Sequence, residues 1–361
     1  MTTSSLLDLY SDYLLCSFGQ TTATGLAALL PDQISHDQVT RMLSRNTFDQ
    51  KTLWKIVKPH IRACESPEGV LILDDSVEEK LYTDENEIIC WHFDHCLGRS
   101  VKGINLLSCV YHSKEMTLPL DFEIVTKTKW EVDPKTGKGK FVSEVTKNEL
   151  ARAMILRAKD KQISFQYVLM DTWFAAADTL VFIKTKVKKD FVTALKSNRR
   201  VALSLEAKKS GKWERLDQLH FESGCPQMIY LESVEFAILV HRQVFSNEDG
   251  SEGILYLVTS DLSLCSGQIE AIYQTRWKVE EYHKSLKSCA SFSKSPTKKV
   301  RTQSNHLFAS LVAYVKLEVC KSRCHVNHFA LRARLYREAL NAAFSGWQEL
   351  RQSGLAPAIT L

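Results

Sequence analysis

Four residues suited to binding phosphate and metal recur at fixed spacing late in the chain. Tyr273, Arg276, Glu280 and Lys287 stand at offsets of 0, 3, 7 and 14. Each residue of an α-helix turns by roughly 100°, so the sequence predicts one stripe along a single long helix. A carboxylate flanked by cations and a phenol can hold a metal ion and bind phosphates. The alternative is a solvated face carrying i,i+4 pairs such as Arg276 with Glu280.

Two upstream strands are expected to end in aspartates. The apolar run from Val70 ends in Asp74 and Asp75, and a second apolar run ends in Asp171. Adjacent side chains of a strand point to opposite faces, so only one of the first two aspartates can face a given site. We favour Asp74, because Ser76 completes an Asp-x-Ser pattern, and keep Asp75 as the alternative. Taken alone, Asp171 fits better as a helix N-cap.

Three acids in such positions predict a site for divalent cations. Mg²⁺ (or Mn²⁺) prefers oxygen ligands, and two such ions roughly 3.5–4 Å apart can flank a phosphodiester. About three convergent carboxylates suffice, and Asp74 (or Asp75), Asp171 and Glu280 supply them. Because these residues are distant in sequence, only the tertiary fold can bring them together.

Composition indicates a soluble globular protein with a sizeable core. The chain has 361 residues, 44% of them hydrophobic and 25% charged, with a net charge of +5. Basic residues concentrate in residues 184–200 and 294–301, which are either solvated surface or phosphate-binding edges. No secretory signal or membrane span is recognisable, so we expect a cytoplasmic protein whose ten cysteines are free thiols.

One local cluster of soft ligands comprises Cys90, His92, His95 and Cys96. Structural zinc sites usually draw two ligand pairs from separated places, whereas this cluster is a single run. The pattern therefore favours an ordinary cluster over a zinc site.

The first 66 residues are expected to be helical. Ser35 and Gln38 form a capping-box pattern at the start of a short helix that ends near Arg45. With Gln38, Arg41 and Arg45 on one side, this helix suits a DNA recognition helix. An ordinary helical bundle explains the same pattern equally well.

Farther along, hydrophobic runs and turn residues predict alternating strands and helices. The expected elements are strands at 70–75, 105–112 and 118–126, a polar loop at 127–140, a helix at 141–159, a strand at 165–171, a helix at 174–186, a strand at 191–195, short strands within 198–260, a long helix capped by Ser263 or Ser266, and helices at 306–321 and 329–350. The order is β-β-β-α-β-α-β, then a β-rich stretch and the long helix.

These motifs in this order resemble the DDE transposases of the insertion-sequence-4 superfamily. The family signature Tyr-x2-Arg-x3-Glu-x6-Lys is matched at every spacing by the stripe described above. Residues 73–76 resemble the first Asp motif of the family and residues 170–174 its second, and 191–199 and 257–261 also look familial. The resemblance covers about residues 68–320.

The resemblance implies an α/β fold in which an RNase H-like mixed-sheet core carries a β-rich insertion between flanking helical regions. The implied divisions are a helical N-terminal DNA-binding region (1–66), the first part of the core (67–197), the β-rich insertion (198–258), the second part of the core with the glutamate helix (259–320) and a C-terminal helical region (321–361).

The resemblance also implies a reaction and roles for residues. The reaction is Mg²⁺-dependent cutting of transposon ends and their joining to target DNA, in some relatives through a hairpin. Asp74, Asp171 and Glu280 would hold two metal ions. The implied DNA contacts are Tyr273, Arg276 and Lys287 at the cut end, with Lys284, Arg199 and Arg41 as further candidates.

Three functional hypotheses follow. The first is a cut-and-paste transposase that acts as a homodimer on paired terminal inverted repeats of double-stranded DNA, at the bacterial nucleoid. The second is an RNase H-like nuclease that hydrolyses DNA without strand transfer, because attack by water needs the same metals. The third is a catalytically inactive protein that only binds terminal repeats; the intact acids argue against it.

Overall fold

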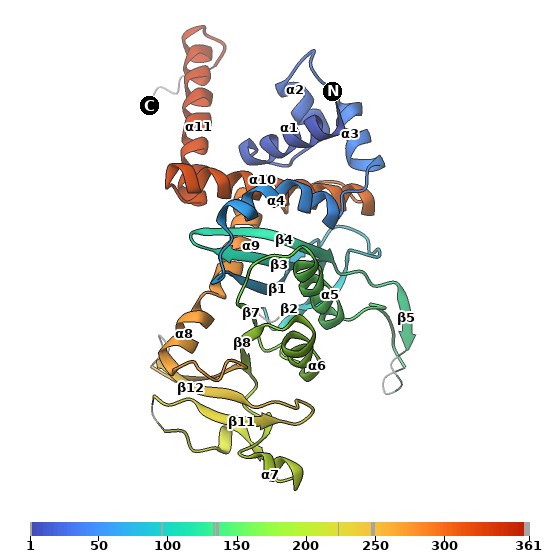
Figure 1. Ribbon diagram of the computed structural model, residues 1–361. Coiled ribbons are helices and arrows are strands. Elements are labelled where there is room, and N and C mark those ends of the chain that lie inside the picture. The colour runs from blue at the N-terminus through green and yellow to red at the C-terminus, as the bar shows by residue number, and fades with distance from the viewer. Residues whose placement is uncertain are drawn as a thin grey trace. The chain divides into compact units, whose positions relative to one another are not determined.

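The computed structural model describes residues 2–94, 97–132, 134, 137–222, 224–246 and 250–356. The chain forms two compact units. The first unit combines Met1–Asp49 with Lys284–Leu361, and the second is Gln50–His283. Both appear in Figure 1, where the colour follows residue number.

The second unit is built on an 11-stranded mixed sheet. Its strands are β1 (Val70–Glu79), β2 (Cys90–Asp94), β3 (Arg99–Ser113), β4 (Met116–Ile124), β7 (Tyr167–Met170), β8 (Asp190–Leu195), β9 (Arg200–Ala202), β10 (Glu214–Arg215), β11 (Gln227–Leu231), β12 (Ile238–Ser246) and β13 (Glu252–Thr259). A separate two-stranded hairpin contains β5 (Lys129–Val132) and β6 (Gly139–Val142).

Five strands form the centre of the sheet in the order β4-β3-β1-β7-β8 (Figure 1). β1 is parallel to β7, and β7 is parallel to β8, whereas β1 and β3 are antiparallel, as are β3 and β4. Because residues 70–73 have strands on both sides and are buried, that part of β1 reads as a continuous apolar run. Beyond β8, the sheet continues antiparallel through β13, β12, β11, β9 and β10.

Helices pack on this sheet. α4 (Gln50–Cys64) contacts β4, α5 (Lys147–Asp160) contacts β3 and β4, and α8 (Ser266–Gln274) contacts β8 and β13. α5 begins at a capping box in which Thr146 and Glu149 satisfy each other's backbone N–H groups. Helix α6 (Ala177–Val181) continues into a π-helical turn, η1 (Phe182–Val187), and α7 (Leu205–Lys209) lies among the added strands. The expected mixed α/β, RNase H-like core is confirmed.

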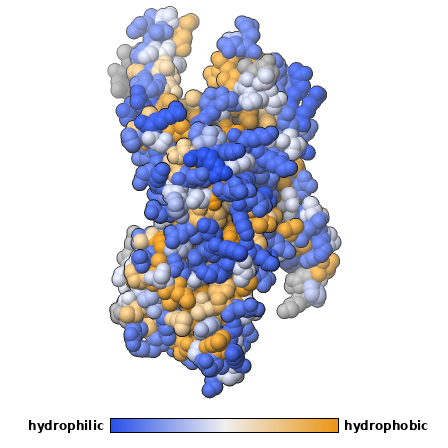
Figure 2. Space-filling view, in the orientation of Figure 1, coloured by the Kyte–Doolittle hydropathy of each residue, from blue (hydrophilic) through white to orange (hydrophobic). Residues whose placement is uncertain are grey.

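The added strands leave apolar side chains at the surface. Met228 of β11, Phe245 of β12 and Ile254 of β13 are exposed. Figure 2 shows hydrophobic surface among hydrophilic residues in the region of β11 and β12.

The first unit is helical. It contains α1 (Thr3–Cys16), α2 (Ala23–Leu29), α3 (His36–Arg45), α10 (Val300–Cys324) and α11 (His328–Gln352). α10 is buried against α1 and α3, and the Tyr10 hydroxyl is hydrogen-bonded to Nδ1 of His306 at 3.0 Å. The capping box predicted at Ser35 and Gln38 is confirmed.

Several expected boundaries are wrong. β1 runs on through Asp74 and Asp75 to Glu79, because ten residues of β3 pair with it, so the acids lie within the strand rather than at its end. The loop expected at 127–140 instead contains β5 and the start of β6, which runs on to Val142, so α5 starts at Lys147 instead of 141. Strand β2 was not expected. The strand expected at 201–205 ends at Ala202, and α8 has Cys265 as N-cap instead of Ser263 or Ser266.

Two further features concern the residues that the structure describes. None of their helices is both long and apolar enough to cross a membrane. The nine cysteines among them carry free thiols.

Candidate active site

The sheet brings two aspartates from distant parts of the chain side by side. In the parallel pairing of β1 with β7, Leu73 lies opposite Met170, so Asp74 and Asp171 are the next residues along each strand. Burial, together with the negative charges of Asp171 and Asp75, raises the pKa of Asp74 to about 7. This carboxyl group therefore lies in a buried place with a surplus of negative charge.

Asp171 also organises the turn that follows β7. Its Oδ1 accepts the backbone N–H groups of Trp173 at 2.9 Å and Phe174 at 3.4 Å. Burial nevertheless raises the pKa of Asp171, while these hydrogen bonds lower it. The carboxyl group holds a turn, not a helix, because α6 begins only at Ala177.

Asp75 has different partners from Asp74, as strand alternation requires. Its carboxylate receives hydrogen bonds from Lys147 Nζ at 3.0 and 3.1 Å and from Asn105 Nδ2 at 2.5 Å. The lysine comes from the first turn of α5. Asp75 is therefore paired with a lysine at hydrogen-bond distance.

The expected single helix from Tyr273 to Lys287 is wrong: it is two helices. α8 ends at Gln274 and α9 (Trp277–Cys289) begins after a short junction. Through the junction the backbone forms i→i−3 bonds, from Arg276 N to Tyr273 O at 2.9 Å and from Val279 N to Arg276 O at 3.1 Å. Such bonds wind the chain more tightly than an α-helix, so the four side chains do not form one straight stripe. No glycine or proline in this segment signals the break.

Arg276 lies at this junction and connects the remaining predicted residues. Its Nη2 donates to Glu280 Oε1 at 2.7 Å, and its guanidinium lies 5.5 Å from the ring centroid of Tyr273. Its positive charge also lowers the pKa of both Asp74 and Asp171, so it stands near both. The i,i+4 ion pair between Arg276 and Glu280, considered above as part of a solvated helix face, is thus formed. It lies near the two aspartates.

His283 is a residue that the sequence analysis missed. It lies one turn beyond Glu280 on α9 and is buried. Its Nδ1 is 3.9 Å from Asp74 Oδ2, and its Nε2 is 3.4 Å from Ser108 Oγ. Because His283 follows Glu280 by three residues, the sequence could have placed both on the same side of a helix. It could not show which strand that side of the helix faces.

The donor chemistry fits a divalent cation, although no site is preassembled. Within the described ranges, no three acidic, histidine or cysteine side chains lie close enough to hold a metal ion. Asp74 and Asp171 offer hard oxygen ligands whose pKa values are raised by burial and by neighbouring carboxyl groups, and a bound cation would stabilise their ionised forms. Glu280, the third predicted ligand, is paired through its Oε1 with Arg276.

The other predicted DNA-binding residues lie elsewhere. Lys287 is in the last turn of α9, and the Lys284 ammonium lies 5.4 Å from the Phe329 ring centroid. Arg199 lines a pocket of about 280 Å³ together with Trp173, next to the turn held by Asp171. In the first unit, Arg41 lines a pocket of about 300 Å³ on α3, and its Nε donates to the Asp37 carbonyl oxygen.

Only half of the cysteine–histidine cluster can be placed. Sγ of Cys90 lies 3.2 Å from Nε2 of His92, and both side chains are buried. His95 and Cys96 lie outside the described residues.

Comparison with known proteins identifies the family. The family model described as DDE superfamily endonuclease matches residues 2–215, which include Asp74 and Asp171. The model described as Transposase DDE domain matches residues 142–316, which include Asp171 and Glu280. No curated protein matches the chain. Because the first model covers more than half of the sequence, the protein belongs to the DDE superfamily of endonucleases and carries a transposase DDE domain.

Proposed function

We propose that the protein is a cut-and-paste transposase of the insertion-sequence-4 superfamily. It would cut DNA at the ends of its own element and join the freed ends to target DNA. The observation that carries the proposal is the pair of carboxylates on adjacent parallel strands, Asp74 and Asp171, with the Arg276–Glu280 pair beside them. The match to a transposase DDE domain supports it.

In this proposal Asp74, Asp171 and Glu280 are the metal ligands. Two bound Mg²⁺ (or Mn²⁺) ions would supply Lewis-acid stabilisation to the attacking and leaving oxygens of an in-line displacement. Asp75 is the weaker candidate for the first ligand, because Lys147 and Asn105 already occupy its oxygens.

Arg276 has two competing partners in this scheme. In the absence of DNA its guanidinium binds Glu280. A DNA phosphate accepts the same fork of donors, so substrate binding would draw the guanidinium away and free the Glu280 carboxylate. In this scheme, DNA binding to Arg276 would free Glu280 to bind metal with Asp74 and Asp171. Tyr273 would help to position the Arg276 guanidinium, which contacts its ring.

Further elements of the proposal concern DNA and assembly. Lys287, Lys284, Arg199 and Arg41 would contact terminal inverted repeats or target DNA. Residues 1–66 would be a DNA-binding region, 67–197 and 259–320 the catalytic core, 198–258 an insertion and 321–361 a C-terminal helical region. A homodimer would hold paired ends at the bacterial nucleoid, with a hairpin intermediate as one route.

The test uses the full-length protein, Mg²⁺ and DNA that carries the element's own ends. We expect a nick at the terminal phosphodiester and a joined product with target DNA, and we expect Glu280→Gln to abolish both. Cutting without joining under any divalent ion would favour the hydrolytic nuclease. Sequence-selective binding without cutting would favour an inactive repeat-binding protein. Unchanged cutting by the Glu280→Gln variant would refute the site.

A further inference from the structure

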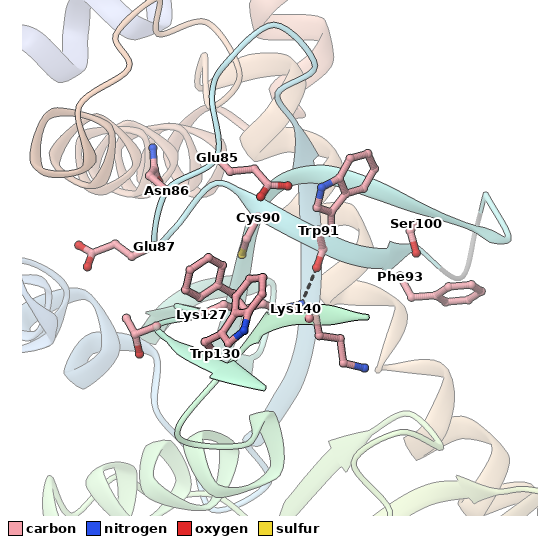
Figure 3. Close-up of a pocket in the computed structure, with 13 residues that line it drawn as sticks. Glu85, Asn86, Glu87, Cys90, Trp91, Phe93, Ser100, Lys127, Trp130 and Lys140 are labelled. Atoms are coloured by element: carbon pink, nitrogen blue, oxygen red, sulfur yellow. Dashed lines mark hydrogen bonds between the residues drawn. The ribbon is translucent and has the colours of Figure 1, made fainter. Parts of the chain in front are cut away.

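The cysteines of the chain lie in different surroundings, and the proposed reaction uses none of them. Cys90 lines a hollow of about 820 Å³ beside β2 and the hairpin β5–β6, where Figure 3 shows it among the labelled side chains. Its side chain is buried, and its Sγ lies 3.2 Å from Nε2 of His92. Burial raises the pKa of Cys90 to about 11 and lowers the pKa of His92 to about 4, so both groups are neutral at pH 7. A buried, neutral thiol of this kind is a poor metal ligand, because metals bind the thiolate.

Two cysteines at the end of α10 have the opposite character. Cys320 and Cys324 are four residues apart in the last turns of this helix, which places their side chains on the same face. Their Sγ atoms lie 4.0 Å from each other. Cys324 is exposed and Cys320 is half-buried, so solvent reaches both sulfur atoms. These two side chains are called the dithiol pair below.

The helix prevents the dithiol pair from closing into a disulfide. Residues i and i+4 of a helix keep their Cβ atoms about 5–6 Å apart, whereas a disulfide needs about 3.5–4.5 Å. The last turn of α10 would have to unwind, but it is capped: the backbone N–H of His325 donates to the Lys321 carbonyl oxygen at 2.9 Å. His325 itself adopts the left-handed conformation of a helix C-cap, with φ of 53°. The two thiols therefore stay available as separate ligands.

The spacing of the two sulfur atoms matches two ligands of one tetrahedral ion. Zn²⁺ binds cysteine sulfur at about 2.3 Å, so two sulfur ligands of a tetrahedral site lie about 3.8 Å apart. The observed distance of 4.0 Å is close to this value, so both sulfur atoms can bind one ion after small side-chain rotations and without movement of the backbone. Thiolate sulfur also selects such cations over Mg²⁺, which prefers oxygen ligands.

The electrostatics of the helix end favour thiolates that share a cation over bare thiolates. The carbonyl groups at the C-terminal end of a helix carry partial negative charge, which attracts cations and repels anions. Burial, together with the neighbouring Cys324 thiol, raises the pKa of Cys320, whereas the charge of Arg323 lowers it. The other cation of this turn, Lys321, is paired with Glu318 at 2.8 Å. A bound metal ion would supply the positive charge that two adjacent thiolates require.

We propose that Cys320 and Cys324 form a binding site for a thiophilic divalent cation such as Zn²⁺. Both thiols release their protons to solvent, both thiolates bind the ion, and water completes the tetrahedron. Within the described residues, no third acidic, histidine or cysteine side chain joins the pair, so the ion keeps exchangeable positions. The site differs from the proposed Mg²⁺ site, whose ligands are oxygen atoms. A bound ion would link residues one turn apart and stabilise the end of α10.

The experiment titrates the full-length, reduced protein with Co²⁺ under argon and records thiolate-to-cobalt charge transfer in the near ultraviolet. Co²⁺ occupies the same tetrahedral thiolate sites as Zn²⁺ but absorbs light. We expect a band that saturates at one ion per chain and disappears when Zn²⁺ displaces Co²⁺. Cys320→Ser and Cys324→Ser should each lose the band, because a single thiol cannot chelate the ion. Cys16→Ser, which changes another exposed cysteine, should retain it, and so should Asp74→Asn, because carboxylate oxygens give no such band.

Circular dichroism separates loss of the site from misfolding. If either serine variant is misfolded, the alanine variant at the same position replaces it, because alanine is the better helix former. An unaltered protein without the band, or a band that survives in the folded variants of both cysteines, would overturn the site. A disulfide between Cys320 and Cys324, found by mass spectrometry after mild oxidation of the folded protein, would overturn the geometric argument and with it the site. None of these measurements involves DNA, so failure of this site and failure of the proposed function are distinguishable.

Discussion

Replacing Asp74 with asparagine removes a buried negative charge while keeping the shape of the side chain. The Asp74 side chain is 18% exposed, and its pKa in the folded protein is about 7, against 3.8 for the ordinary group. A raised pKa means that the folded state binds a proton more tightly than the unfolded state. The resulting stability is complete below pH 4 and is lost as the pH rises through 7.

The size of the effect follows from this difference. At about 1.4 kcal/mol per pKa unit, the raised pKa costs about 4 kcal/mol at pH 8, where Asp74 is ionised in the folded protein, and about 2 kcal/mol at pH 5, where folding must protonate it. Asparagine avoids this cost, and its Oδ1 can still accept the backbone N–H of Asp75, which Asp74 accepts at 2.9 Å. We therefore expect Asp74→Asn to stabilise the metal-free protein and to abolish cutting.

Urea unfolding in EDTA, followed by tryptophan fluorescence, measures the gain. With an m value of about 3 kcal/mol/M, the midpoint should rise by roughly 1.3 M at pH 8 and by roughly 0.7 M at pH 5. Asp75→Asn is the matched control, because that carboxylate is paired with Lys147 and its loss should lower the midpoint. A midpoint for Asp74→Asn that falls, or that rises equally at both pH values, would refute the buried-charge reasoning.

Three other predictions concern the same site. Mg²⁺ binding, measured by calorimetry, should strengthen about tenfold per pH unit below pH 7 and level off above it, because the metal must displace the proton of Asp74; a flat profile would contradict this. Lys147→Met should lower the free energy of unfolding by about 1–3 kcal/mol in urea titration, because it leaves Asp75 buried without its cation, and an unchanged value would show that the pair is dispensable. Arg276→Lys should weaken cutting at least tenfold with less effect on the unfolding midpoint, because lysine lacks the planar guanidinium fork that can bind a phosphate through two hydrogen bonds; equal rates would exclude a role for that fork.

Much of the fold follows from local pattern alone. The apolar residues preceding Asp74 and Asp171 predicted the two central strands, because a strand buried on both faces needs an unbroken apolar run. Ser35 and Gln38 predicted a helix start, because a capping box satisfies backbone groups within a few residues. The order of the five core strands β1, β3, β4, β7 and β8 and of helices α5 and α6 was predictable for the same reason and is confirmed, whereas β2 and the hairpin β5–β6 were not predicted.

Sequence patterns failed where long-range pairing decided the outcome. The extension of β1 past its acids depends on β3, and the hairpin β5–β6 depends on cross-strand contact between Trp130 and Phe141 in a segment rich in lysine and glycine. The residues of one strand do not show which other segment of the chain will pair with it.

The sequence by itself determined which residue types are available for chemistry and, approximately, the strand or helix near each, because residue type and periodicity are local properties. Only the tertiary structure decided the partners: Asp74 beside Asp171, Asp75 on Lys147, and Arg276 on Glu280 at a junction between two helices. The physical reason is that burial and neighbouring charge determine the state of a carboxyl group, and both arise only when distant segments of the chain pack together.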